Sequence, residues 1–171
     1  MFNPDFNELL SIFNEKKIKY LVVGGYAVGL HAQPRATKDL DLFIRPDPVN
    51  GTAVYEALRR FGASLQAVTP NDFIQQGAFF RIGRAPVMVE IFPEIEGLDF
   101  DSAWERRVQT VIDPDTGLTA FFVSRDDLIV AKLATGRLQD LAYVDALRKA
   151  AKSKKPSRPR SRAGESGPSR E

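Results

Sequence analysis

Apolar residues recur at helical spacing in several parts of the chain. Residues 4–15 carry apolar side chains three or four positions apart and follow Asn3-Pro4, a favourable helix start, so they are predicted to form an amphipathic helix. The same spacing predicts helices at 26–31, 49–61, 124–136 and 138–150. For the helix at 124–136, Ser124 is a favourable cap and Gly136 a favourable end.

Between these helices lie short apolar or alternating runs that are typical of strands. They occur at 18–23, 40–44, 78–82, 87–92, 108–112 and 118–123. The short links at 83–86 and 114–117 predict that the last four runs form two hairpins. Because helices and strands are interleaved, we expect the α/β (α+β) class, with a mixed sheet and flanking helices.

Composition narrows the class of protein. A chain of 171 residues favours one main domain. It has no cysteine, which excludes disulfides and thiolate metal sites and favours a cytoplasmic location. No apolar run approaches the length of a membrane span, and the first residues do not resemble a signal peptide, so we expect no membrane association.

Charge is unevenly distributed along the chain. Residues 152–171 hold seven Lys or Arg and two Glu, whereas residues 1–151 hold 17 basic and 20 acidic residues. The tail is also rich in Ser and Pro and nearly lacks apolar side chains, so we expect it to be disordered. It is either an arm that binds nucleic acid or a solvated extension.

Three carboxylates stand out in the predicted strands. In the run DLDLFI, Asp39 and Asp41 point to the same side of a strand, roughly 6.6 Å apart, where like charges repel. Glu90 lies within the apolar run VMVEIF. Each feature also fits a solvent-facing strand, but if the strands are neighbours the three side chains converge. Hard oxygen ligands of this kind select Mg²⁺ or Mn²⁺.

Gly24-Gly25 separates a predicted strand from a short helix. Glycine lets a ligand approach the backbone, and a helix N-terminus offers free N–H groups to a phosphate. A plain tight turn is the alternative. With the carboxylates, the pair indicates in-line phosphoryl transfer assisted by two metal ions.

The run GGYAVGLHAQPRATKDLDLF resembles the nucleotidyltransferase fold of the DNA polymerase β superfamily, and in style the AbiEii-type toxin-like nucleotidyltransferases. In those proteins a Gly-Gly or Gly-Ser turn precedes an Arg-x-Thr/Ser and an acidic-x-Asp pair. Arg35, Thr37, Asp39 and Asp41 match that run, while Gly25 stands where many members have Ser. The resemblance covers roughly residues 15–150, and its later part is matched by Lys132, Arg137 and Asp140.

This resemblance implies transfer of a nucleoside monophosphate from an NTP to a hydroxyl of RNA or protein. Asp39 and Asp41 would bind Mg²⁺ or Mn²⁺, and Glu90 would be the third ligand or the base. The expected nucleotide-binding residues are Gly24, Gly25, Arg35, Thr37, Lys132, Arg137 and Asp140. Arg137 and Asp140 either reach the nucleotide or form a surface i,i+3 ion pair.

The resemblance also implies an organisation and a set of partners. We expect a nucleotidyltransferase core at 1–123, a C-terminal helical extension at 124–151 and the basic tail at 152–171. A cognate toxin or antitoxin protein is an expected partner. The alternative is a non-catalytic module that binds a nucleotide or a partner, antitoxin-like or regulatory. A transferase for small antibiotic-type molecules is a third option, weakened by the short acceptor-binding portion.

Overall fold

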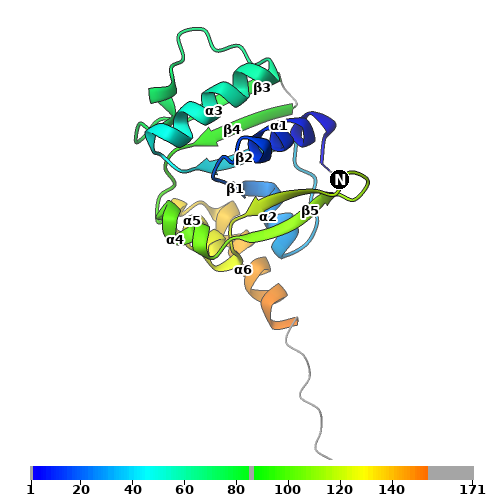
Figure 1. The fold of residues 1–171 in the computed structure, drawn as a ribbon. Coiled ribbons are helices and arrows are strands. Elements are labelled where there is room, and N and C mark those ends of the chain that lie inside the picture. The colour runs from blue at the N-terminus through cyan, green and yellow to red at the C-terminus, as the bar shows by residue number, and fades with distance from the viewer. Residues whose placement is uncertain (1, 85–86, 154–171) are drawn as a thin grey trace, which may run out of the picture.

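The computed structural model describes residues 2–84 and 87–153. These residues contain a six-stranded mixed sheet of strand order β3-β4-β2-β1-β6-β5 (Figure 1). The strands are β1 Tyr20–Val23, β2 Asp39–Ile44, β3 Phe80–Arg84, β4 Val87–Phe92, β5 Val108–Asp113 and β6 Leu118–Phe122. All six predicted strands and both hairpins are therefore present, with ends shifted by one or two residues.

The predicted helices form as well. They are α1 Pro4–Glu15, α2 Gly24–His31, α3 Pro48–Phe61, α5 Arg125–Thr135 and α6 Leu138–Ser153. The sequence pattern missed α4 Phe100–Glu105 and the 3₁₀ turn η1 Pro70–Phe73. Both are too short to show a helical repeat, and each depends on a local cap: Asp99 accepts from the Ser102 backbone, and Asp72 accepts from the Thr69 backbone.

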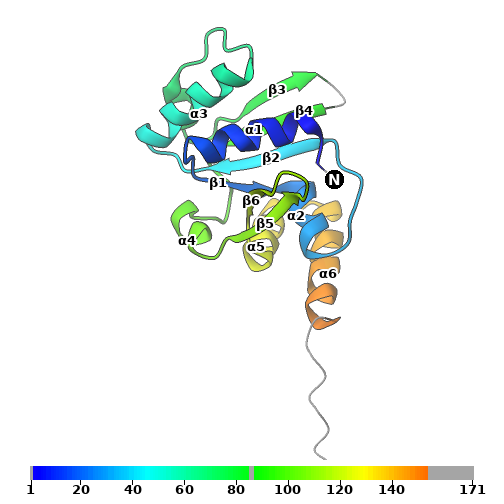
Figure 2. The same cartoon turned by 45° about the vertical axis from the view of Figure 1, so that its right-hand side comes forward.

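Helices cover both faces of the sheet (Figures 1 and 2). On one face, Phe6 of α1 and Phe61 of α3 line a cavity together with Ile82 and Val89 of the sheet. On the other face, α4 packs Phe100 against Phe43 of β2, with the ring centroids 5.0 Å apart. The helices α2, α5 and α6 pack on one another. Because side chains alternate along a strand, the β2 residues Asp39 and Asp41 point to the same face as Phe43.

Strand β2 lies inside the sheet. It pairs with β1 in antiparallel and with β4 in parallel orientation. DLDLFI is therefore not an edge strand, as the alternative of a solvent-facing strand with polar side chains would suggest, and the edges of the described sheet are β3 and β5.

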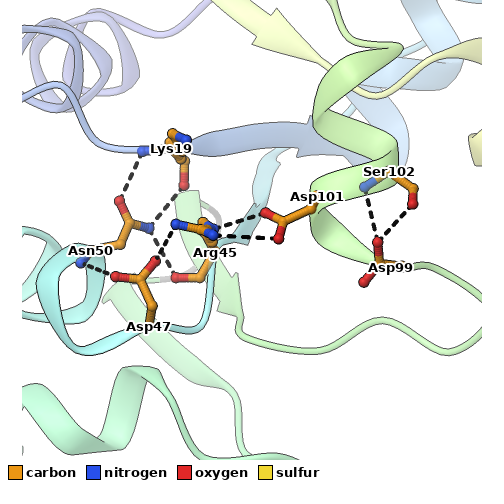
Figure 3. Close-up of polar contacts among 7 residues, drawn as sticks. All are labelled: Lys19, Arg45, Asp47, Asn50, Asp99, Asp101 and Ser102. Carbon is orange, nitrogen blue, oxygen red and sulfur yellow. Dashed lines mark hydrogen bonds and ion pairs between the residues drawn. The ribbon is translucent and has the colours of Figure 1, made fainter.

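The end of β2 opposite the carboxylates is fixed by a buried polar residue (Figure 3). The Asn50 amide donates to the carbonyls of Lys19 and Arg45, both at 3.0 Å, and its Oδ1 accepts from the Lys19 N–H at 2.9 Å. Arg45 in turn forms ion pairs with Asp47 and Asp101. These bonds tie α3 to β1 and β2 and hold the pairing register of the two strands.

The C-terminal boundary differs slightly from the prediction. Helix α6 runs to Ser153, so Lys152 and Ser153 belong to the helix rather than to the tail. The rest of the predicted tail lies outside the described residues. None of the described helices is long and apolar enough to span a membrane.

Candidate active site

One row of residues crosses four neighbouring strands. Val23 of β1 is in register with Asp41 of β2, Asp41 with Glu90 of β4, and Glu90 with Arg81 of β3. Residues in register project to the same face of a sheet. The pairing of β2 with β4 therefore puts Asp41 and Glu90, which are distant in sequence, side by side.

Gly24 follows this row directly and begins α2. Its φ is +63°, and a Cβ atom at this position would lie 1.9 Å from Oδ2 of Asp41. Any other residue would be strained and would also collide with the carboxylate. The helix begins at Gly24 rather than at the predicted Tyr26, and no side chain caps it. Its first N–H groups therefore open beside Asp41.

Gly25 is required for a different reason. A Cβ on Gly25 would lie 2.7 Å from Oγ1 and 2.9 Å from Cβ of Thr37. The Thr37 side chain thus fills the space that a residue-25 side chain would take. In this chain, a larger residue at position 25 would have to displace the Thr37 side chain.

Asp41 lies in an unfavourable environment for a negative charge. Burial, together with the negative charges of Glu90 and Asp39, raises its pKa from 3.8 to about 7, although Lys132 and Arg81 act in the opposite direction. A cation bound beside Asp41 would remove this penalty. In the described part of the chain, however, no three His, Cys, Asp or Glu side chains converge as a metal site. Glu90 instead forms an ion pair with Arg81.

A cleft of about 540 Å³ opens over this row. It is lined by five of the predicted site residues: Gly24, Asp41, Glu90, Lys132 and Arg137. A separate cavity of about 420 Å³ is lined by three others, Gly25, Arg35 and Thr37. Gly24 lines the cleft and Gly25 lines the separate cavity, so most of the predicted nucleotide-binding residues are divided between two cavities that meet at the first turn of α2.

Asp140 is a partner of Lys132 and lines neither cavity. Their ion pair measures 3.1 Å, the two side chains are only 12% and 14% exposed, and Thr135 also donates to Asp140. Burial would raise the pKa of Asp140, but the hydrogen bonds from Thr135 and Lys132 outweigh it and lower that pKa. The predicted surface pair of Arg137 with Asp140 is absent among the described residues. Arg137 makes no ion pair there and faces the cleft.

Sequence reasoning missed the residues on the β3 side of the cleft. Arg81 and the stacked rings of Phe79 and Phe92, 5.8 Å apart, line this part of it. The predicted 78–92 hairpin contained the necessary signal for Arg81. Counting back from the predicted link at 83–86 pairs Arg81 with Met88, which puts it on the same face of the sheet as Glu90, whereas the structure places Arg81 directly opposite Glu90.

The fold and the acidic, glycine-flanked cleft define a protein of the nucleotidyltransferase class. The chain belongs to the family described as nucleotidyltransferase of unknown function (DUF6036), whose model matches residues 5–150. The comparison does not separate out the AbiEii-type subtype, which stays a prediction. A comparison with curated protein sequences finds no significant match.

Two solved structures match this chain. One is the lincomycin-bound lincosamide antibiotic adenylyltransferase LnuA, with a TM-score of 0.53 and 14% identity, covering 88% of this chain and 98% of that chain. The other is an antigenic nucleotidyltransferase-like protein from Paracoccidioides brasiliensis, with a TM-score of 0.48 and 19% identity, covering 90% of this chain and 76% of that chain. At these identities, the likeness to LnuA shows the fold alone.

Proposed function

We propose that this protein is a metal-dependent nucleotidyltransferase that moves a nucleoside monophosphate from an NTP to a hydroxyl and releases pyrophosphate. The observation that carries the proposal is the close approach of Asp41 to Gly24 at the opening of α2. It sets a carboxylate that needs a cation beside backbone N–H groups that suit a phosphate.

The chemistry of the three carboxylates suits a divalent metal, although they do not converge in the described structure. Asp39 and Asp41 share one face of β2, and Glu90 stands opposite Asp41, so three oxygen donors of the type that Mg²⁺ and Mn²⁺ prefer lie on adjacent strands. In this proposal all three hold the metal once Glu90 turns from Arg81 toward Asp41. Bound metal would neutralise charge on the reacting phosphate.

The chain's own groups supply binding and orientation. The N–H groups of the first turn of α2 receive the triphosphate, and Lys132 and Arg137 face it from the α5 side of the cleft. Lys132 is held in place by Asp140. The alternative role for Glu90, if it does not bind the metal, is to accept the proton of an attacking hydroxyl.

The acceptor is proposed to be a hydroxyl of RNA or protein, with a cytoplasmic toxin-antitoxin role following from the AbiEii resemblance. A small-molecule acceptor is the second candidate. The similar structure LnuA is an antibiotic adenylyltransferase, and this chain covers 98% of it. A short acceptor-binding portion is therefore no argument against a small molecule.

Transfer of label from α-³²P-NTP tests the proposal. Purified protein is incubated with each labelled NTP, bulk RNA or cell lysate, and either Mg²⁺, Mn²⁺ or EDTA. We expect labelling only with a metal, and its loss in Asp39→Asn and Asp41→Asn but not in Asp115→Asn, a change in an exposed turn. Labelling that persists in both site variants would refute the assignment, whereas nucleotide binding without transfer would favour the non-catalytic module.

A further inference from the structure

Arg81 forms an ion pair with Glu90, one of the proposed metal ligands. It lies on the edge strand β3, directly opposite Glu90 in the pairing register, and its guanidinium Nη2 donates to Glu90 Oε1. The Glu90 side chain is 18% exposed and that of Arg81 is 55% exposed. The pair therefore joins a half-buried acid to an arginine whose other side is open to solvent.

Glu90 has a neighbour on each side in the sheet. Arg81 stands on β3 and Asp41 on β2, and adjacent strands are about 4.8 Å apart. While Arg81 holds Oε1, the Glu90 carboxylate is drawn toward the edge strand. This agrees with the finding that no three acidic side chains converge in the described residues. Glu90 can join Asp39 and Asp41 at one cation only by weakening its bond to Arg81.

We propose that Arg81 is a built-in counterion that holds Glu90 in the metal-free protein and competes with the divalent metal for it. It is a positioning residue, and the inference rests on the proposed metal-dependent function. When Glu90 turns to the metal, the guanidinium stays in the cleft. It has a second partner there, since it already lies 5.9 Å from the ring of the half-exposed Phe79.

The competition predicts an unusual result for a variant at this cleft. Removing a guanidinium next to an acidic site normally weakens the local structure, and the metal-free protein should melt at a lower temperature. Metal binding, however, should become tighter because the metal no longer displaces a competing cation. For an ion pair that is half exposed, the expected gain in affinity is about two- to fivefold.

The test is a Mn²⁺ titration of the full-length protein without nucleotide. The electron paramagnetic resonance signal of free Mn²⁺ gives the Kd, and thermal melts are recorded with and without the metal. Arg81→Gln is compared with wild type and with Arg84→Gln. Arg84 is exposed on the same strand, is in register with Val87 rather than Glu90, and by alternation points to the opposite face of the sheet from Arg81, so its loss changes net charge equally without touching Glu90.

We expect Arg81→Gln to bind Mn²⁺ about two- to fivefold more tightly than wild type and to show a larger metal-induced rise in Tm. Arg84→Gln should match wild type. An unchanged or weaker Kd in Arg81→Gln, beside a wild type that binds Mn²⁺, overturns this inference and leaves the metal site standing. An equal gain in Arg84→Gln overturns it as a bulk charge effect. No binding in any variant overturns both the inference and the proposed metal dependence.

Discussion

The charge on Asp41 should destabilise the protein at neutral and alkaline pH. Its pKa is raised, by burial first and then by Glu90 and Asp39, from 3.8 to about 7. The folded protein therefore binds a proton at Asp41 more tightly than the unfolded chain does. The stability that this proton provides is fully present below pH 3.8 and is lost as the pH rises to about 7.

The variant Asp41→Asn removes this charge with almost no change of shape. A pKa raised from 3.8 to about 7 corresponds to about 4 kcal/mol at 1.36 kcal/mol per pKa unit. Because the cleft admits water and salt, we expect Asp41→Asn to gain about 1–3 kcal/mol at pH 8 in EDTA, or a Tm about 3–8 °C higher. At pH 5 the folded protein is largely protonated at Asp41 but the unfolded chain is not, so the difference should be well below its pH 8 value and should nearly vanish only at or below about pH 3.8.

Denaturant unfolding and thermal melts at pH 5 and pH 8 measure both values. Asp115→Asn serves as the control, because Asp115 is exposed in the β5–β6 turn and should change stability by less than about 0.5 kcal/mol at either pH. Mg²⁺ with an NTP should stabilise the wild type by mass action and Asp41→Asn much less. The reasoning is refuted if Asp41→Asn matches Asp115→Asn at pH 8, or if its gain does not depend on pH.

Three further predictions concern the surroundings of the cleft. Gly24→Ala should cost at least about 2 kcal/mol of stability by denaturant unfolding, and Gly117→Ala only about 1 kcal/mol, because both have positive φ but only Gly24 would meet a neighbouring side chain. Equal costs would contradict the close approach at Gly24. Lys132→Met should cost about 2–3 kcal/mol of stability, because it leaves Asp140 buried without its ion pair. Adding Asp140→Asn should recover part of this stability, and strictly additive costs of the two changes would argue against coupling between Lys132 and Asp140. Deleting residues 154–171 should leave the Tm unchanged and flatten the salt dependence of any RNA binding, whereas an unaltered salt slope would exclude an electrostatic arm.

Some features of the candidate site could be predicted because they depend on local sequence. The alternation in DLDLFI fixes Asp39 and Asp41 on one face whatever the strand pairs with, since successive side chains point to opposite sides. In the same way, Gly24-Gly25 after an apolar run indicated the opening of α2. The predicted start of α2 at Tyr26 was two residues too late, because Gly24 and Gly25 were interpreted as a turn before the helix. Gly24 is in fact the first residue of α2, with a positive φ and with the Asp41 carboxylate in the space of a side chain.

One of the two alternatives for Arg137 and Asp140, the surface ion pair, is not formed in the described structure, because local spacing did not describe their real environment. Arg137 and Asp140 have the i,i+3 spacing of a helical ion pair, but Arg137 lies before the first residue of α6, after Gly136 with its φ of +64°. The chain changes direction there, so the spacing rule does not apply. Asp140 instead reaches Lys132 on the preceding helix, a contact that depends on how α5 packs on α6.

The sequence by itself determined five of the described helices, the six strands, the two hairpins and the identity of the three carboxylates, because periodicity and turn residues act over a few neighbouring positions. Tertiary structure alone decided that β2 lies inside the sheet and that Glu90 stands between Asp41 and Arg81. Strand order depends on which long-range pairings bury the most apolar surface, and a local pattern carries little information about that choice. The charge environment of Asp41 follows from that order, because its burial and its acidic neighbour on β4 both arise when the strands pair.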